Sequence, residues 1–288
     1  MALASDLTIA LINGLSWGIT IALIALGLNL IFGLLEIVNM AHGSLYMLGA
    51  VTGWFVVDAT GSFFLALLIA PIAVAVIGVV LERVVLRPIE DDISITLIAT
   101  FGFLLIFQQL ALLTFGPGTR TIEAPITATL QFAGLSYSAY RIVVAVVSVL
   151  LIALLYAFLF RTRMGMWMRG VRQDLETASA LGVPTSQVYM LTFGLGAAFA
   201  ALAGVLLAPI VSVNHLMGLD ILAVAFIVVI VGGLGSLQGV LVASLLYAFL
   251  ENFGAVFIAP VEARILTLVI MIVFVLLRPD GVFEEGAI

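Results

Sequence analysis

The sequence predicts an all-α polytopic membrane protein of about eight to ten transmembrane helices, with about nine as the best count. Three observations predict this class. Of the 288 residues, 64% are hydrophobic and 9% are charged, and the mean hydropathy is +1.35. A soluble domain has roughly a quarter of its residues charged, so this composition cannot cover a surface that faces water. Because one transmembrane helix takes about 20 apolar residues, the spans leave only short loops.

Charge and composition exclude several other classes. The formal net charge is -6, and the 10 basic residues are all arginines without a continuous basic patch, so nucleic-acid binding is not expected. The chain has no cysteine, which removes thiol chemistry. The start of the chain, Met1 to Thr8, contains no basic residue and matches a signal peptide poorly. We expect residues 1–288 to form a single transmembrane domain.

The predicted spans follow the apolar stretches and the turn residues between them. Gly116, Pro117 and Gly118 end the fourth span, and residues 119–140 alternate in a way that fits a short β-hairpin or an irregular cap. The stretches lie at about 9–32, 45–57, 63–81, 93–115, 142–160, 188–207, 219–231, 240–257 and 265–277.

Two of these spans are short and adjoin polar or glycine-rich segments, which predicts broken helices. The segments are residues 39–45, before the second span, and residues 232–237, after the seventh. Paired interruptions in two halves of a chain indicate a transporter site near the middle of the membrane. The glycines expected to break helices are Gly33, Gly43, Gly232, Gly233 and Gly235.

Loop arginines predict the orientation of the chain. If the loop after the third span, the stretch after the fifth span and the C-terminus share one side, that side carries seven arginines and the other carries three. Cytoplasmic loops are enriched in arginine. The N-terminus is therefore expected outside and the C-terminus in the cytoplasm, which requires an odd number of spans.

The most charged stretch, residues 161–184, predicts an amphipathic helix on the cytoplasmic side. Arg172 and Glu176 are four residues apart and can pair along it, Gly182 suits its C-terminal end, and Pro184 suits the start of the next span. Two interpretations stay open: a linker on the membrane surface, or a docking helix for a cytoplasmic partner. The apolar positions that share one face are Met164, Met168, Val171, Leu175 and Ala178.

A second group of polar residues lies at membrane depth. Glu36, Asn39 and His42 are spaced at three, and Ser44 follows, so the set can line one helical face. It predicts a substrate path or gate, and the alternatives are interhelical hydrogen bonds or a loop at the cytoplasmic surface. No metal site is expected, because His215 is the only other histidine.

Two threonines of the fourth span, Thr96 and Thr100, share one face of the predicted helix. Helix packing and contact with a substrate both account for them. We count them among the candidate pathway residues.

Several separated motifs resemble one family. Arg-Thr-Arg-x-Gly-x-x-x-Arg from Arg161, followed by Gln-Asp-x-Glu-x-Ala-x-x-x-Gly-Val from Gln173, looks like the cytoplasmic coupling segment of ABC importer permeases. More narrowly, the chain resembles the branched-chain amino-acid (LIV-type) permeases from about Asn13 to Pro279. The further motifs that carry this resemblance are Asn13–Ser16, Ala25–Gly33, Val38–Ala50 and Gly232–Ser236 with Gly239.

The resemblance implies a permease domain over residues 1–288 in the bacterial cytoplasmic (inner) membrane. It implies a second, usually non-identical permease chain, two ABC ATPase subunits and an extracytoplasmic solute-binding protein. The run Gly232 to Gly235 lacks the lysine and hydroxyl residue of a P-loop, so ATP and Mg are expected on the ATPases and no cofactor or enzymatic activity on this chain. The residues implied in coupling are Arg161, Gly165, Arg169, Asp174, Glu176, Ala178 and Gly182.

Three functions are therefore weighed. The first is a permease subunit of an ATP-driven importer for branched-chain amino acids or a related small polar solute, since some members resemble urea, short-amide or aromatic-acid permeases. The second is a carrier or channel driven by an ion gradient, for which Glu36 is the candidate coupling carboxylate. The third, a membrane scaffold, has no use for glycine breaks and polar residues at membrane depth.

Overall fold

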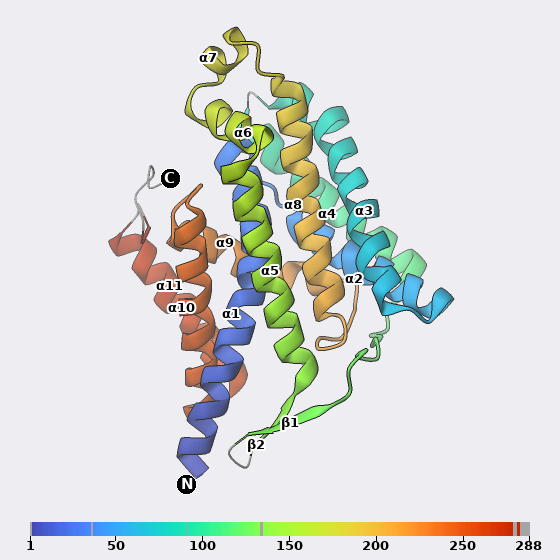
Figure 1. Cartoon of the computed structure of the whole chain (residues 1–288), viewed down its shortest axis with the longest axis vertical. Helices are drawn as coiled ribbons and strands as arrows, with labels where there is room; N and C mark the ends of the chain where they lie inside the picture. The colour runs from blue at the N-terminus through green and yellow to red at the C-terminus, as the bar shows by residue number, and fades with distance from the viewer. Residues whose placement is uncertain (1, 36, 91, 133–134, 279–280, 283–288) are drawn as a thin grey trace. The chain divides into compact units, whose positions relative to one another are not determined.

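The computed structural model describes residues 2–35, 37–90, 92–132, 135–278 and 281–282, and these are predominantly helical (Figure 1). One small hairpin accompanies the helices. The elements are α1 (Ala2–Leu35), α2 (His42–Thr60), α3 (Phe63–Leu81), η1 (Glu82–Leu86), η2 (Arg87–Ile89), α4 (Ile93–Phe115), β1 (Thr129–Phe132), β2 (Leu135–Ser138), α5 (Ala139–Arg161), α6 (Arg163–Gln173), α7 (Leu175–Ala180), α8 (Thr185–Leu207), α9 (Met217–Gly232), α10 (Leu237–Phe257) and α11 (Pro260–Leu277).

Every predicted span lies in a helix, which confirms an all-α polytopic membrane protein. Within the described part of the chain, 7 helices are long and apolar enough to cross a membrane. The other two predicted spans correspond to α2 and to α9, which has only 16 residues. The count of nine therefore stays a prediction.

The chain divides into two compact units, each built from separate segments. Unit 1 comprises Met1–Leu26, Ala124–Leu150 and Ala223–Ile288, and unit 2 comprises Gly27–Glu123 and Leu151–Leu222. Helices α1, α5 and α9 contribute residues to both. The expectation of one permease domain over residues 1–288 stays a prediction.

Small residues hold unit 2 together. Helices α2, α3 and α8 pack against one another (Figure 1). A Cβ built on Gly204 of α8 would overlap the backbone of Tyr46 in α2, and one on Gly49 of α2 would overlap the backbone of Ala201. Without a hydrophobic driving force between helices inside a membrane, such close backbone packing is a main source of attraction. The sequence therefore places glycine and alanine where α8 meets its neighbours.

The two ends of unit 2 are fixed by arginines. At one end α3 continues into η1 and η2, where Arg87 donates a hydrogen bond to Ser186 Oγ in the first turn of α8. At the other end the backbone of Arg120 pairs with Val213 in both directions. The Arg120 guanidinium lies 4.1 Å from the ring centre of Trp54, and it donates to the Phe115 carbonyl oxygen. These contacts tie the loops to helix ends rather than leaving them free.

Unit 1 contains the helix pair α10 and α11 and the antiparallel hairpin β1–β2. The hairpin is one of the two structures that the sequence allowed for residues 119–140. Tyr137 in β2 donates a hydrogen bond to Asn13 Oδ1 in α1, and Trp17 donates to a carboxylate oxygen of Glu251 in α10. Polar side chains thus connect α1 to both the hairpin and α10.

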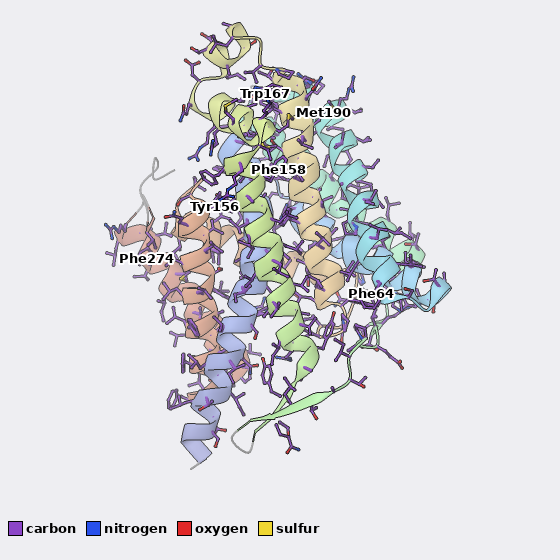
Figure 2. All side chains as sticks on the ribbon, viewed as in Figure 1. Phe64, Tyr156, Phe158, Trp167, Met190 and Phe274 are labelled. Carbon is purple, nitrogen blue, oxygen red and sulfur yellow. The ribbon has the colours of Figure 1, made fainter. Side chains whose placement is uncertain are left out.

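Several helices expose many apolar side chains. Phe64 at the start of α3 is 76% exposed and points outward (Figure 2). In each of the candidate spans formed by α3, α5 and α11, at most a third of an apolar stretch of 18 residues is buried. Surfaces this apolar suit lipid, which agrees with the membrane class.

The close packing of α8 on α2 predicts unequal effects of two glycine-to-alanine substitutions. For Gly204→Ala we expect the free energy of unfolding to fall by about 1–3 kcal/mol, because the new Cβ meets backbone atoms that cannot rotate away. For Gly102→Ala in α4 we expect no loss, since its Cβ meets no atom within 4 Å. Thermal unfolding in detergent measures both, and equal midpoints would contradict the packing argument.

Candidate functional site

The first helix break lies between α1 and α2. Helix α1 continues to Leu35 and α2 begins at His42, with a coil and a turn between them. Gly33 therefore lies inside α1 and Gly43 inside the first turn of α2, so neither is the break that the sequence suggested. Glu36 lies outside the described residues.

Asn39 and His42 do not share a helical face, which corrects the sequence interpretation. Asn39 is in the coil before α2, and its carbonyl oxygen accepts a hydrogen bond from the His42 amide at 3.2 Å. Both side chains are fully buried. The spacing of three residues reflects a turn followed by a helix start rather than one helix surface.

Thr100 of α4 holds this break in place. Its hydroxyl lies 3.0 Å from the Val38 carbonyl oxygen and accepts a hydrogen bond from the Met40 amide at 3.2 Å. Thr96 is buried on the same face of α4 but donates to Ile93 in its own helix. Of the two predicted threonines, the structure thus brings only Thr100 into hydrogen-bond contact with the break.

The break lies deep in the span. Ser44, in the first turn of α2, donates from its hydroxyl to the Leu104 carbonyl oxygen at 3.2 Å. Leu104 is the middle residue of α4, a 23-residue candidate span, and Thr100 lies one turn earlier. Helix α2 therefore starts near the middle of α4 rather than at a membrane surface.

A second helix begins at the same depth. Gly43 of α2 and Gly218 of α9 meet backbone to backbone: a Cβ on either one would overlap the carbonyl oxygen of the other. The sequence paired residues 39–45 with residues 232–237 as interrupted helices in two halves of the chain, and this pairing stays a prediction. The contact of Gly43 with the beginning of α9 was not predicted. Asn214 and His215, polar residues just before α9, were the signal that could have found this junction.

The polar groups at this junction are not fully satisfied. The N-cap of α2 is Ala41, so no side chain caps its first amides. Within the described part of the chain, neither Asn39 Oδ1 nor Asn39 Nδ2 has a hydrogen-bond partner. A buried amide without partners costs about 1–3 kcal/mol, which favours a role in binding over a purely structural one.

The glycines after α9 form the second predicted break. Gly232 is the last residue of α9. Gly233 and Gly235 have φ angles of 94° and 78°, a backbone region that residues with a side chain rarely adopt. Ser236 then caps α10 by accepting a hydrogen bond from the Gly239 amide. These residues end one helix and start the next within unit 1.

The charged stretch forms two helices, so the expectation of a single amphipathic helix is wrong. Asp174 has φ −161° and ψ 103°, which ends α6, and its carboxylate caps α7 by accepting hydrogen bonds from the Thr177 amide and hydroxyl at 2.9 and 2.5 Å. The hydrogen bond from the Thr177 hydroxyl lowers the pKa of Asp174 most, and the hydrogen bond from the Thr177 amide lowers it further. The cap is therefore present at neutral pH and is lost only as the pH falls through this lowered pKa.

The other coupling candidates have distinct places. Gly165 is buried where α6 approaches the Leu159 carbonyl of α5, and Arg169 lies over the Phe160 ring at 4.6 Å. Arg161 is the last residue of α5, and Glu176 is exposed in α7. Gly165 and Arg169 thus fix α6 on α5.

Ala178 and Gly182 complete the end of α7. Ala178 is buried, and its carbonyl oxygen accepts from the Val183 amide while Gly182, with φ 82°, donates to Ser179. This is the glycine C-terminal motif that the sequence predicted.

Apolar side chains face outward on these two helices. Leu181 is 80% exposed, and Met166 and Leu175 are also exposed, although the one-helix interpretation placed Leu175 on one face with Met168, Val171 and Ala178, which are buried. Figure 2 shows Trp167 of α6 and Met190 of α8 at this same end of unit 2. The segment therefore presents leucines beside charged residues.

The role of Thr100 predicts a local effect. For Thr100→Val we expect the free energy of unfolding to fall by about 1–3 kcal/mol and the Met40 amide to exchange its hydrogen faster, because Val38 and Met40 lose their partner. Thr114→Val on the same helix is the matched control, since that hydroxyl bonds only within α4. Equal exchange rates in the two variants would show that Thr100 does not hold the break.

Comparison with known proteins places the chain in a family. Residues 10–276 match the model of a family described as "Branched-chain amino acid transport system / permease component". The chain is 31% identical to the high-affinity branched-chain amino acid transport system permease protein LivH of Escherichia coli K12, over 94% of this chain and 93% of LivH. It is 31% identical to BraD of Pseudomonas aeruginosa, named as a permease of the same kind, over 94% of each chain.

A second type of permease is also similar. The chain is 29% identical to LivM of Escherichia coli K12, over 78% of this chain and 59% of LivM. No solved structure is significantly similar to the chain. Since the family model spans most of the sequence and the LivH and BraD alignments span nearly all of it, this protein belongs to the branched-chain amino acid transport permeases, a family of membrane transport components rather than enzymes, as its motifs predicted.

Proposed function

We propose that this chain is the transmembrane permease subunit of an ATP-driven ABC importer for branched-chain amino acids or a related small polar solute, such as urea, short amides or aromatic acids. The observation that carries the proposal is the membership of nearly the whole chain in the permease family. The break at mid-span and the outward-facing segment α6–α7 support it, because a transporter needs both a path and a coupling element.

The path runs past the α1–α2 break in this proposal. Asn39, His42 and Ser44 are buried there, and Thr100 braces the coil that carries Asn39. Intramembrane polar residues are costly and normally serve transport or binding. We assign the substrate path to Glu36, Asn39, His42, Ser44, Thr96 and Thr100.

Coupling to ATP hydrolysis takes place at α6 and α7. The exposed leucines Leu175 and Leu181 flank the acidic residue Glu176, which suits a partner surface with an apolar pocket and basic rim. Gly165, Arg169, Asp174, Ala178 and Gly182 hold the segment in shape, while Arg161 and Glu176 face solvent. ATP and Mg bind to the ATPase subunits.

The assembly contains two permease chains, two ATPases and an extracytoplasmic solute-binding protein. Similarity to both LivH and LivM supports a pair of different permeases. The chain lies in the bacterial inner membrane with its N-terminus outside and its C-terminus in the cytoplasm, so that α6 and α7 face the ATPases.

Purification of the chain from its native membrane in mild detergent tests this proposal. We expect ATPases with Walker motifs and a second permease-like chain in the preparation, and ATP-dependent uptake of L-leucine after reconstitution with the binding protein. Recovery of the chain alone, with uptake that needs no ATP, would instead support an ion-gradient carrier. Glu36→Gln would then abolish coupling, whereas in an ATP-driven permease it lowers the rate at most.

The docking surface predicts the effect of one exposed leucine. For Leu181→Ser we expect about tenfold less ATPase in the purified complex, because a leucine buried at an interface contributes about 1.5–3 kcal/mol. Leu216→Ser, in the loop before α9, changes a leucine that is also exposed and should leave ATPase recovery unchanged. Quantitative mass spectrometry measures the ratio of ATPase to permease, and equal ratios in the two variants would refute docking through Leu181.

A further inference from the structure

Two helices of unit 2 begin next to each other at the middle of a span. Gly43 is the second residue of α2 and Gly218 the second residue of α9, and their backbones touch. The contact between Ser44 and Leu104 places this junction at the middle of α4. The first amides of a helix have no acceptor within the helix and carry partial positive charge, so a helix start at this depth attracts an anionic group.

The two helix starts are not equivalent. Helix α9 carries Asp220 in its first turn, and this carboxylate offsets the positive end of its own helix. Helix α2 has no acidic residue in its first turn and no side-chain cap. Helix α2 therefore has no acidic residue of its own to offset its positive end.

Asn39 supplies the second observation. Its side chain is fully buried just before α2, and neither atom of its amide has a partner among the described residues. The coil that carries it is held on both sides by Thr100, through Val38 and Met40, and its own carbonyl accepts from the first residue of α2. A buried amide that is fixed in position but unpartnered is prepared for a ligand that brings both a donor and an acceptor.

Among the solutes named above, an α-amino acid brings both groups in charged form. An α-amino acid carries an ammonium, which donates, and a carboxylate, which accepts. The amide Oδ1 can accept from the ammonium and Nδ2 can donate to the carboxylate. Urea and short amides also bring a donor and an acceptor, but they have no charge to interact with the helix start, and an aromatic acid without an amino group leaves Oδ1 unpartnered.

We propose that the junction of α2 and α9 binds the zwitterionic head group of an α-amino acid. The carboxylate lies against the first amides of α2 and Asn39 Nδ2, and the ammonium donates to Asn39 Oδ1. In this structure the junction is closed, because Asn39 is buried and Gly43 touches Gly218. The ligand enters when α2 and α9 separate. This assignment rests on the proposed function and selects amino acids from the solutes named there.

The first experiment measures head-group recognition without the soluble binding protein, which has its own selectivity. The membrane complex is purified with its partner chains, and binding of radiolabelled L-leucine is followed by scintillation proximity. L-leucinamide lacks the carboxylate and 4-methylpentanoate lacks the ammonium. We expect each to compete at least about tenfold more weakly than L-leucine, the effect of one lost charged hydrogen bond. Equal competition by either analogue would overturn the proposal.

The second experiment changes the residue. Asn39→Asp keeps the shape of the side chain but sets a negative charge against the carboxylate, so we expect L-leucine binding to weaken about tenfold or more while L-leucinamide gains relative to L-leucine. Asn252→Asp makes the same exchange in α10, where the side chain donates a hydrogen bond to Ala248 of its own helix, and should change neither value more than about twofold. An unchanged ratio of the two ligands in Asn39→Asp contradicts the assignment.

The outcomes separate this assignment from the proposed function. If the reconstituted wild-type complex takes up no branched-chain amino acid with ATP and binding protein present, the proposed function fails. If it takes up L-leucine but the analogues compete equally in the binding assay, the function stands and the head-group site is wrong. If Asn39→Asp does not yield folded protein, the wild-type analogue series still decides the question.

Discussion

A chain that interrupts a helix inside a membrane must satisfy the backbone groups that the interruption frees, because no water is present to do so. In this protein Thr100 does that for the α1–α2 break, through Val38 and Met40, while the Asn39 carbonyl takes the first amide of α2. The rest of the site depends on these few bonds. They allow α2 to start at mid-span, and they leave the Asn39 side-chain amide without a hydrogen-bond partner among the described residues.

Contacts between small residues set how closely the helices around the break approach. Gly43 meets Gly218, and Gly204 meets Tyr46, with backbone atoms on both sides of each contact. At both contacts the atom nearest to the glycine is a backbone oxygen, so no side chain has to be displaced at that point when two helices move apart. A junction closed by glycine can therefore open with few rotamer changes, whereas the same contact through leucines would have to unlock a packed core.

The sequence predicted the secondary-structure elements better than the contacts between them. Apolar stretches and turn residues located every span-forming helix and the glycine end of α7, and they allowed the hairpin as one of two structures, because these features follow from local composition and backbone preference. Gly218 was missed because its role depends on Gly43, 175 positions earlier in the chain. The split at Asp174 was missed because the apolar spacing of residues 164–178 fits one helix, and only the capping bonds to Thr177 show that two helices are preferred.

Within unit 2, helix α8 connects α6 and α7 to α2. It begins directly after α7, contacts both α6 and α7, and packs along α2 through Ala201 and Gly204. Arg87 of η2 donates a hydrogen bond to Ser186 in the first turn of α8. In the proposed importer, a displacement of α7 by the ATPase reaches α2 through one continuous helix. Because α2 carries Gly43, movement of α8 then acts on the contact between Gly43 and Gly218. The short, capped shape of α7 matters for this reason: a segment fixed by Asp174 at one end and Gly182 at the other transmits force to α8, whereas a flexible loop would absorb it.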